Sequence, residues 1–312
     1  MAPLPKPFQH TVLAIWDAYE KSNSAGDNLG VPMSQVGNEC ERAIWYSFRW
    51  ASPPEIIDGQ KQRKFNTGNI EEERLLDELE NAGIQIERLD PATGSQFRIS
   101  LADGWLRGKM DAKALGLPEA PKTLHVVECK SHNDRSFKEL KKKPLKEAKP
   151  EHYAQCQLYM LAENLTRCLY LAVNKNNEEL HAERIELDKV FARKLEAKVE
   201  RIVQSNKTPP KLFENPAERA AFQCLWCPAK GQCHEGHFAR VNCRTCIESE
   251  FQEGAVVRCK LLKKELSYDE QQAGCAQHRY LPSLVPGEQT DADEKTRAII
   301  YKLGDGRVWV DQ

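Results

Sequence analysis

The chain has 312 residues, of which 40% are hydrophobic and 29% charged, with 45 basic residues against 46 acidic ones. That length allows one sizeable core and a smaller appended unit, while the near-neutral net charge excludes an indiscriminate polyanion binder. No apolar run approaches the roughly 18 residues of a membrane span, and the first residues lack the features of a signal peptide, so we expect a soluble, cytoplasmic protein.

The first third is predicted to be helical, because apolar residues recur at helical spacing. These helices cover residues 10–22, 38–51 and 68–83. From about Gln96 the pattern changes to short β-like runs over residues 96–115 and 123–132, with glycines and a proline near their breaks. The change in periodicity indicates the start of a sheet.

The chain then continues through further regular elements. After a lysine-rich segment, the predicted elements are a helix (151–165), two strands joined by an Asn-rich turn (167–176 and 179–188) and a helix (190–205). Residues 299–312 contain a Gly-Asp-Gly centre that predicts a terminal β-hairpin. We predict an α/β fold with a mixed sheet flanked by helices in residues 1–235, and a small cysteine-rich, metal-binding module in residues 236–312.

Three polar side chains in the predicted sheet need a chemical explanation. Glu128 and Lys130 are two residues apart on one strand, so both leave the same face. Asp111 ends the preceding strand candidate and would lie beside Glu128 if the strands pair. Burying such groups is costly unless they bind a cation or pair with each other. The two carboxylates suit Mg²⁺ or Mn²⁺, and Lys130 would orient a nucleophile or offset charge during phosphodiester hydrolysis.

The order of these motifs resembles a known family. The pattern D…ExK, followed by a helix on which Gln155 and Tyr159 lie one turn apart, is similar to the RecB-like branch of the PD-(D/E)XK nucleases. The resemblance implies a restriction-endonuclease-like core with Gln155 and Tyr159 beside the active site. It also implies that Glu72 is a metal ligand. Relatives often have histidine after the preceding glycine, where this chain has Asn69.

Each part of this pattern also has an ordinary explanation. A Glu-x-Lys pattern on a strand is common by chance, and its members usually form cross-strand ion pairs. Gln155 and Tyr159 by themselves would be an ordinary helix face. The nuclease interpretation therefore depends on all of these residues occurring together in the order of the family.

Eleven cysteines are present, and seven of them lie between Cys224 and Cys275. In a reducing cytosol, cysteines are more often metal ligands or buried thiols than disulfide partners. We expect packing roles for the three that fall inside predicted regular elements, which are Cys129, Cys156 and Cys168. The uneven distribution predicts a ligand-rich C-terminal region.

The first cysteine group, C-x2-C-x5-C, contains Cys224, Cys227 and Cys233 and needs at least one further ligand. Zinc would accept His234 or His237. Iron-sulfur members of the RecB-like family, including AddB-type and CRISPR-adaptation nucleases, have three such cysteines after the core and one before it. That resemblance implies a 4Fe-4S cluster completed by Cys40, whose alternative role is that of a buried thiol.

A second group follows and offers five ligands where a closed zinc site needs four. Its members are Cys243, Cys246, Cys259, Cys275 and His278. The sequence leaves open which of the last three completes a Zn²⁺ site with Cys243 and Cys246.

A run of lysines lies between the catalytic strand and the Gln155 helix. Its members are Lys138, Lys141, Lys142, Lys143, Lys146 and Lys149. They would contact DNA phosphates near the active site, or they form an ordinary solvated face.

The resemblance favours a DNA exonuclease of the phage-recombination type in a bacterial or phage-infected cell, with a single-strand annealing or recombination protein as partner. A structure-selective endonuclease with the same site and a non-catalytic DNA-binding module are the alternatives.

Overall fold

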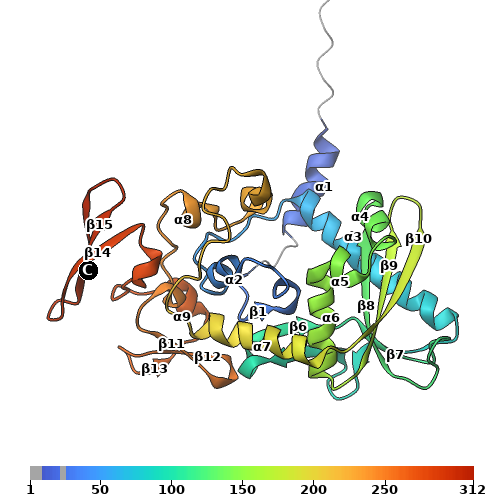
Figure 1. Cartoon of the computed structure of the whole chain (residues 1–312). Helices are drawn as coiled ribbons and strands as arrows, with labels where there is room; N and C mark the ends of the chain where they lie inside the picture. Colours follow the sequence, from blue (N-terminus) through green and yellow to red (C-terminus); the bar gives the residue numbers. More distant parts are fainter. Residues whose placement is uncertain (1–8, 22–25) are drawn as a thin grey trace, which may run out of the picture.

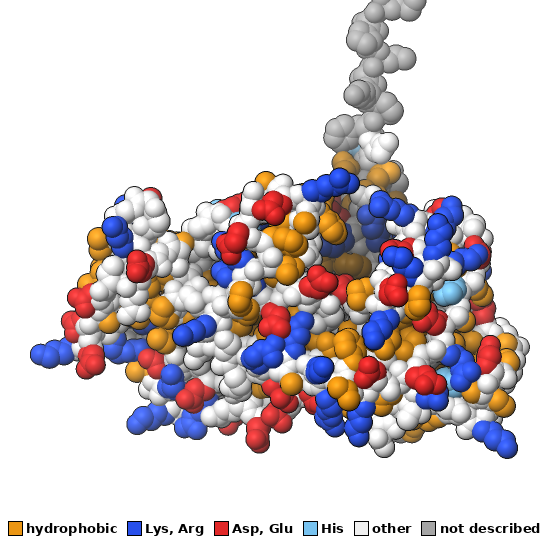
Figure 2. Space-filling view, viewed as in Figure 1, with side chains coloured by type: hydrophobic (Ala, Val, Ile, Leu, Met, Phe, Trp, Pro, Cys, Tyr) orange, Lys and Arg blue, Asp and Glu red, His pale blue; other side chains and the backbone are white. Residues whose placement is uncertain are grey.

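The structure is a computed structural model that describes residues 9–21 and 26–312. A five-stranded sheet lies at one end of the molecule and the sheet that contains β14 and β15 lies at the other, with α2 and α7 between them (Figure 1). Acidic and basic side chains are interspersed over the face drawn in Figure 2, as the balanced composition predicts. Within the described residues, no helix combines the length and the apolar character needed to cross a membrane.

The first two thirds of the chain contain helices and strands in successive groups, with β2 to β8 between α3 and α4. The α-helices are α1 (His10–Lys21), α2 (Glu41–Phe48), α3 (Gly59–Asn81), α4 (Asp134–Leu140), α5 (Leu145–Ala148), α6 (Pro150–Ala162), α7 (Lys189–Gln204), α8 (Lys230–His234) and α9 (Tyr268–Ala273). Short 3-10 turns are η1 (Met33–Gln35), η2 (Ala102–Gly104), η3 (Arg219–Trp226), η4 (Cys243–Thr245), η5 (Glu253–Ala255) and η6 (Pro282–Leu284).

The strands up to residue 186 are β1 (Val31–Pro32), β2 (Gln85–Glu87), β3 (Leu89–Asp90), β4 (Ser95–Gln96), β5 (Arg98–Leu101), β6 (Leu106–Lys109), β7 (Ala112–Leu115), β8 (His125–His132), β9 (Arg167–Asn174) and β10 (Glu179–Glu186). The later strands are β11 (Ser249–Gln252), β12 (Val256–Cys259), β13 (Lys264–Glu265), β14 (Gly287–Asp293), β15 (Ala298–Leu303) and β16 (Val308–Asp311). The predicted terminal hairpin is confirmed as β15 and β16.

The largest sheet has the order β10-β9-β8-β7-β2 and is mixed, because β8 and β9 are parallel and the other neighbours antiparallel. The parallel pair is joined through α4, α5 and α6, which supply the long crossover that such a pair needs. The predicted mixed sheet flanked by helices is therefore confirmed. A finer assignment to the restriction-endonuclease fold stays a prediction.

Helices cover both faces of this sheet. On one face Leu75 and Leu76 of α3 pack with Val127 and Leu169, and on the other, buried side chains of α6 join the larger core with Val126. The alternation of side chains along β8 explains this division, since neighbouring residues of a strand point to opposite faces. Two observed boundaries differ from the prediction: α3 starts at Gly59, where the Asp58 side chain caps it, and Asp111 immediately precedes β7 instead of ending a strand.

The chain beyond residue 235 packs closely on the part before it. Phe251 lies 4.8 Å from Phe48 and 5.4 Å from Trp105, measured between ring centroids. The same apolar core contains buried residues from both parts. The predicted division at residue 235 stays a prediction, and the contacts across it are extensive.

Candidate active site

Two carboxylates, one in β8 and one immediately before β7, meet at the large sheet. Ala112 of β7 pairs with Val127 of β8, so continuing the antiparallel register by one residue sets Asp111 opposite Glu128. The Cys129 amide donates a 2.8 Å hydrogen bond to Oδ2 of Asp111, which fixes that carboxylate against β8. Two carboxylates far apart in sequence are thereby held side by side.

Lys130 supplies the positive charge. Its ammonium contacts Oε1 of Glu128, while Oε2 of the same carboxylate is buried without a hydrogen-bond partner. Burial is the largest influence on the pKa of Glu128 and raises it; Lys130 lowers that pKa and Asp111 raises it again, with a net upward shift. Burial lowers the pKa of Lys130, but the charges of Glu128 and Asp111 outweigh burial, and the net effect is a raised pKa of the ammonium.

Glu72 reaches the same site from α3. Burial and then the charge of Asp111 raise the pKa of Glu72 to about 7, while Lys130 partly offsets both effects. The structure thus brings together Glu72, Asp111, Glu128 and Lys130, although they come from α3, from β8 and from the residue before β7. Mutual repulsion among three carboxylates is a reason for this site to bind a cation.

Gln155 and Tyr159 lie on the side of α6 that faces the site. Nε2 of Gln155 donates to the Tyr159 hydroxyl at 2.9 Å, and that hydroxyl donates to the carbonyl of Lys109 at 2.5 Å. Because Lys109 precedes Asp111 by two residues, this chain of hydrogen bonds ties α6 to the segment that carries the first carboxylate. Oε1 of Gln155 is buried with no partner, so the amide keeps a free acceptor beside the site.

The residues present fit a hard divalent cation by their chemistry. All three acidic side chains offer carboxylate oxygens, which Mg²⁺ and Mn²⁺ prefer, and the unpartnered Oε2 of Glu128 lacks any compensating hydrogen bond. As the side chains stand, no three of the His, Cys, Asp and Glu residues in the described part of the chain form a metal-binding arrangement. The positive charge beside Glu128 is instead the ammonium of Lys130.

A cleft of about 800 Å³ is lined by Gln155 and Tyr159 of α6 and by residues of β5 and β6. Its lining includes Arg98, Arg107 and Lys109. Sequence reasoning missed these cations, although their alternation with apolar residues in QFRISL and WLRGK was the available signal.

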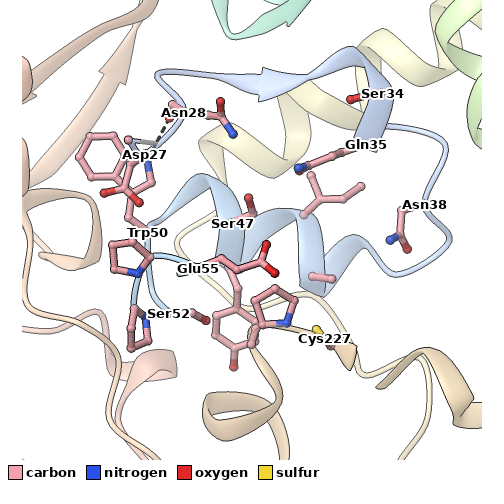
Figure 3. A pocket seen from close by; sticks show the side chains of 18 of the residues that line it. Asp27, Asn28, Ser34, Gln35, Asn38, Ser47, Trp50, Ser52, Glu55 and Cys227 are labelled. Carbon is pink, nitrogen blue, oxygen red and sulfur yellow. Dashed lines mark hydrogen bonds between the residues drawn. The ribbon is translucent and has the colours of Figure 1, made fainter. Parts of the chain in front are cut away.

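A second cavity, of about 490 Å³, shares Asp27, Asn28 and Ser34 with the cleft. Carboxamide and hydroxyl groups from the chain around η1 and from α2, with Glu55, line it (Figure 3). On the face drawn in Figure 2, a hollow lies between the α1 and α4 regions, with lysine and arginine side chains at its rim.

The first cysteine group gathers around one small cavity. Cys40, at the N-cap of α2 and not within the helix as predicted, lines it together with Cys224, Cys227 and Cys233. Four thiols are the donor set of either a zinc ion or a 4Fe-4S cluster. The cavity that the four cysteines line is small, about 20 Å³.

The second cysteine group lines another cavity, of about 200 Å³, which all five predicted ligands border. Nε2 of His278 is 3.1 Å from the Thr245 hydroxyl, and its ring packs edge-on against Tyr280. An amide donates to Sγ of Cys259 at 3.4 Å. The choice of four ligands among the five stays open.

The lysine run is largely occupied by local contacts. Lys138 pairs with Asp134, Lys141 with Glu179 and Lys149 with Glu139. Lys146 lies over the rings of Tyr153 and Phe191 at 5.6 and 5.9 Å. Lys142 and Lys143 are exposed and make no ion pair with the described residues. A role of this run in DNA binding stays a prediction.

Comparisons with known proteins give distant likenesses. No protein-family model matches the sequence, and no curated protein matches it significantly. The alkaline exonuclease LHK-Exo of Laribacter hongkongensis, in complex with dAMP, is 17% identical, with 61% of this chain and 90% of that chain covered and a TM-score of 0.41.

Two further solved structures are similar at the same low level. The protein SSO0001 is 14% identical, with 72% of this chain and 98% of that chain covered and a TM-score of 0.43. A phage-related exonuclease from Haemophilus somnus 129PT is also 14% identical, with 43% and 66% covered and a TM-score of 0.33. Likenesses of this size assign neither a fold family nor an activity to this chain.

Proposed function

We propose that this protein is a divalent-metal-dependent deoxyribonuclease that hydrolyses phosphodiester bonds at DNA ends. The observation that carries the proposal is the meeting of Asp111, Glu128 and Lys130 at the large sheet, with Glu72 beside them. The resemblance of the motif order to the RecB-like nucleases supports action on ends.

In this mechanism Glu72, Asp111 and Glu128 would hold a Mg²⁺ or Mn²⁺ ion, which supplies Lewis-acid polarisation of the phosphodiester. Lys130 would turn its ammonium from Glu128 to the reacting phosphate and offset the negative charge that develops there. The free acceptor of Gln155 would position a donor group of the substrate or of the attacking water. Tyr159, whose pKa is raised by burial, stays protonated and holds Gln155 and the Lys109 carbonyl in place.

The test of this proposal is hydrolysis of linear and covalently closed circular DNA by the full-length protein with Mg²⁺. We expect release of nucleotides from linear DNA alone, and loss of that release in Asp111→Asn and Glu128→Gln. Degradation of circles that have no ends would contradict the exonuclease and favour the structure-selective endonuclease. If the parent protein binds DNA but never cleaves it, the chain is the non-catalytic binding module.

We propose further that Cys40, Cys224, Cys227 and Cys233 hold a 4Fe-4S cluster, and that the second cysteine group holds Zn²⁺. Cysteines far apart in sequence meet only in the fold, so metal binding would stabilise the folded chain. Elemental analysis of anaerobically purified protein should find iron and sulfide, with broad absorbance near ~400 nm typical of thiolate-bound clusters. A colourless protein that contains zinc alone contradicts the cluster.

A further inference from the structure

A cationic surface leads away from the proposed active site along one face of the β5–β6 hairpin. Arg98 pairs with Lys109 and Ser100 with Arg107 in the antiparallel register, so these four side chains leave the same face. All four line the cleft of about 800 Å³ that Gln155 and Tyr159 also line. Lys109 lies two residues before Asp111, so the cationic surface adjoins the first proposed metal ligand.

The three cations of this surface are not neutralised. Arg98, Arg107 and Lys109 are exposed, and none forms an ion pair with a carboxylate of the described residues; Arg107 donates only to the Gly104 carbonyl, at 2.7 Å. Among the described residues that line the cleft, Asp27 is the one acidic side chain. Its carboxylate is already bound by Arg240, at 2.5 Å, and by Gln272, at 3.1 Å, so the cleft presents a positive wall.

The remainder of the cleft lining is less polar. Leu29 is 42% exposed, Pro32 is half-buried, and Tyr268 from α9 contributes a half-buried ring. The Tyr268 hydroxyl donates to the Asp27 carbonyl at 3.0 Å, and the ring packs edge-on against Trp50, so its position is fixed. Unpaired cations together with an aromatic and apolar surface are the features of sites that bind single-stranded nucleic acid, where phosphates meet the cations and bases stack on rings.

We propose that this cleft binds single-stranded DNA next to the bond that is cut, with Arg107 and Lys109 on successive phosphates, Arg98 beside Lys109, and Tyr268 against a base. The inference rests on the proposed nuclease function and adds the form of its substrate. Alternate residues of one strand are ~7 Å apart, a spacing similar to that between phosphates of an extended single strand.

Binding is measured with the full-length protein in EDTA, by fluorescence anisotropy of a labelled oligothymidylate, so hydrolysis plays no part. We expect Arg98→Ala/Arg107→Ala to weaken binding about tenfold or more, and to reduce the slope of log affinity against log salt by ~1.4, which is ~0.7 for each lost phosphate contact. A matched control, Lys295→Ala/Lys302→Ala, removes the same charge from the terminal sheet and should bind within about twofold of the parent.

Tyr268 provides an independent test of the proposed stacking. Tyr268→Phe keeps the ring and should bind like the parent, whereas Tyr268→Ala should weaken binding at least about fivefold. Arginine variants that bind like the lysine control, or a parent that binds a blunt hairpin duplex as tightly as oligothymidylate, would overturn the inference. If the parent binds through the cleft but never cleaves DNA, the nuclease proposal fails while the binding site stands.

Discussion

At the scale of single residues, the candidate site is a cluster of charged side chains, two of which are buried carboxylates. Glu128 is fully buried, Asp111 is 8% exposed, and both contribute to the raised pKa of Lys130. Buried groups of like charge are expensive unless a cation compensates them. Lys130 supplies that compensation in the structure, and its removal therefore tests both catalysis and the electrostatics of the site.

Lys130→Ala should lower the rate of DNA cleavage at least ~100-fold, because it removes a donor aimed at the charge of the transition state. Lys113→Ala is the matched control. Lys113 lies on β7 of the same sheet, and its removal breaks the 2.6 Å ion pair with Glu163 at the end of α6 without altering Glu72, Asp111 or Glu128. Single-turnover cleavage of end-labelled DNA gives both rates, and a Lys130 variant as fast as the control would remove this residue from the mechanism.

A second residue-scale feature is a pair of histidines, the buried His132 and the half-buried His152, around one hydroxyl. Nε2 of His132 and Nδ1 of His152 each lie 2.8 Å from the Tyr170 hydroxyl. Burial, followed by nearby lysines, lowers the pKa of His132 to about 4, and burial lowers that of His152 to about 3. Both rings are therefore neutral in the folded protein at neutral pH.

These histidines predict a loss of stability in mild acid. Below about pH 6.5 these histidines take up protons in the unfolded chain but not in the folded chain. The stability that the neutral histidines contribute is therefore complete above that pH and is lost as the pH falls toward their pKa values in the folded protein. The raised pKa of Glu72 acts in the opposite direction. Urea unfolding should show that His152→Gln reduces the slope of stability against pH by up to ~1.4 kcal/mol per unit. An unchanged slope contradicts the prediction.

At the scale of elements, substitution of two glycines distinguishes the effect of backbone conformational preference on stability from the effect of side-chain packing. Gly68 lies inside α3, and a Cβ there would meet no atom within 4 Å. Gly68→Ala should therefore stabilise the protein by ~0.5–1 kcal/mol. Gly108 of β6 is different, because a Cβ there would lie 2.7 Å from Cε1 of Tyr159 and 2.9 Å from Sδ of Met33.

Gly108→Ala should displace Tyr159 and lower both stability and cleavage, since the clash lies on the hydrogen-bonded link between α6 and Lys109. Thermal unfolding and cleavage assays on the two alanine variants provide the comparison. If Gly108→Ala melts and cleaves like Gly68→Ala, the tyrosine is not held as tightly as these contacts indicate.

Sequence periodicity predicted the elements with strong local signals. Alternation in HVVECKSH and helical spacing in HYAQCQLYM gave β8 and α6 within a few residues, and with them the side chains of Glu128, Lys130, Gln155 and Tyr159. The cationic cleft was not predicted, because Arg98 and Arg107 come together only through the β5–β6 register and face Tyr268 from a distant segment. Such juxtapositions depend on tertiary packing, which local spacing does not encode.

At the scale of the whole molecule, two buried arginines join the region after residue 235 to the first part of the chain. Arg244 donates to the carbonyls of Phe48 and Leu29 at 3.1 and 2.9 Å, and its guanidinium lies 4.0 Å from the ring centroid of Trp50. Arg49 donates to the Arg244 carbonyl at 3.1 Å. Burial lowers the pKa of each arginine to about 9, so carbonyl groups and aromatic faces compensate the buried charge.

These contacts predict that the described parts on both sides of residue 235 unfold together. Arg244→Met would leave two buried acceptors unpaired, the Phe48 carbonyl and Oε1 of Gln271, and should cost ~3 kcal/mol or more. The exposed Arg258 offers the control, because Arg258→Met should change stability by less than ~0.5 kcal/mol. Tryptophan fluorescence and circular dichroism should report one coincident urea transition, shifted in Arg244→Met alone. Two separate transitions would instead make residues 236–312 an independent domain, and the arginines a contact between domains that fold apart.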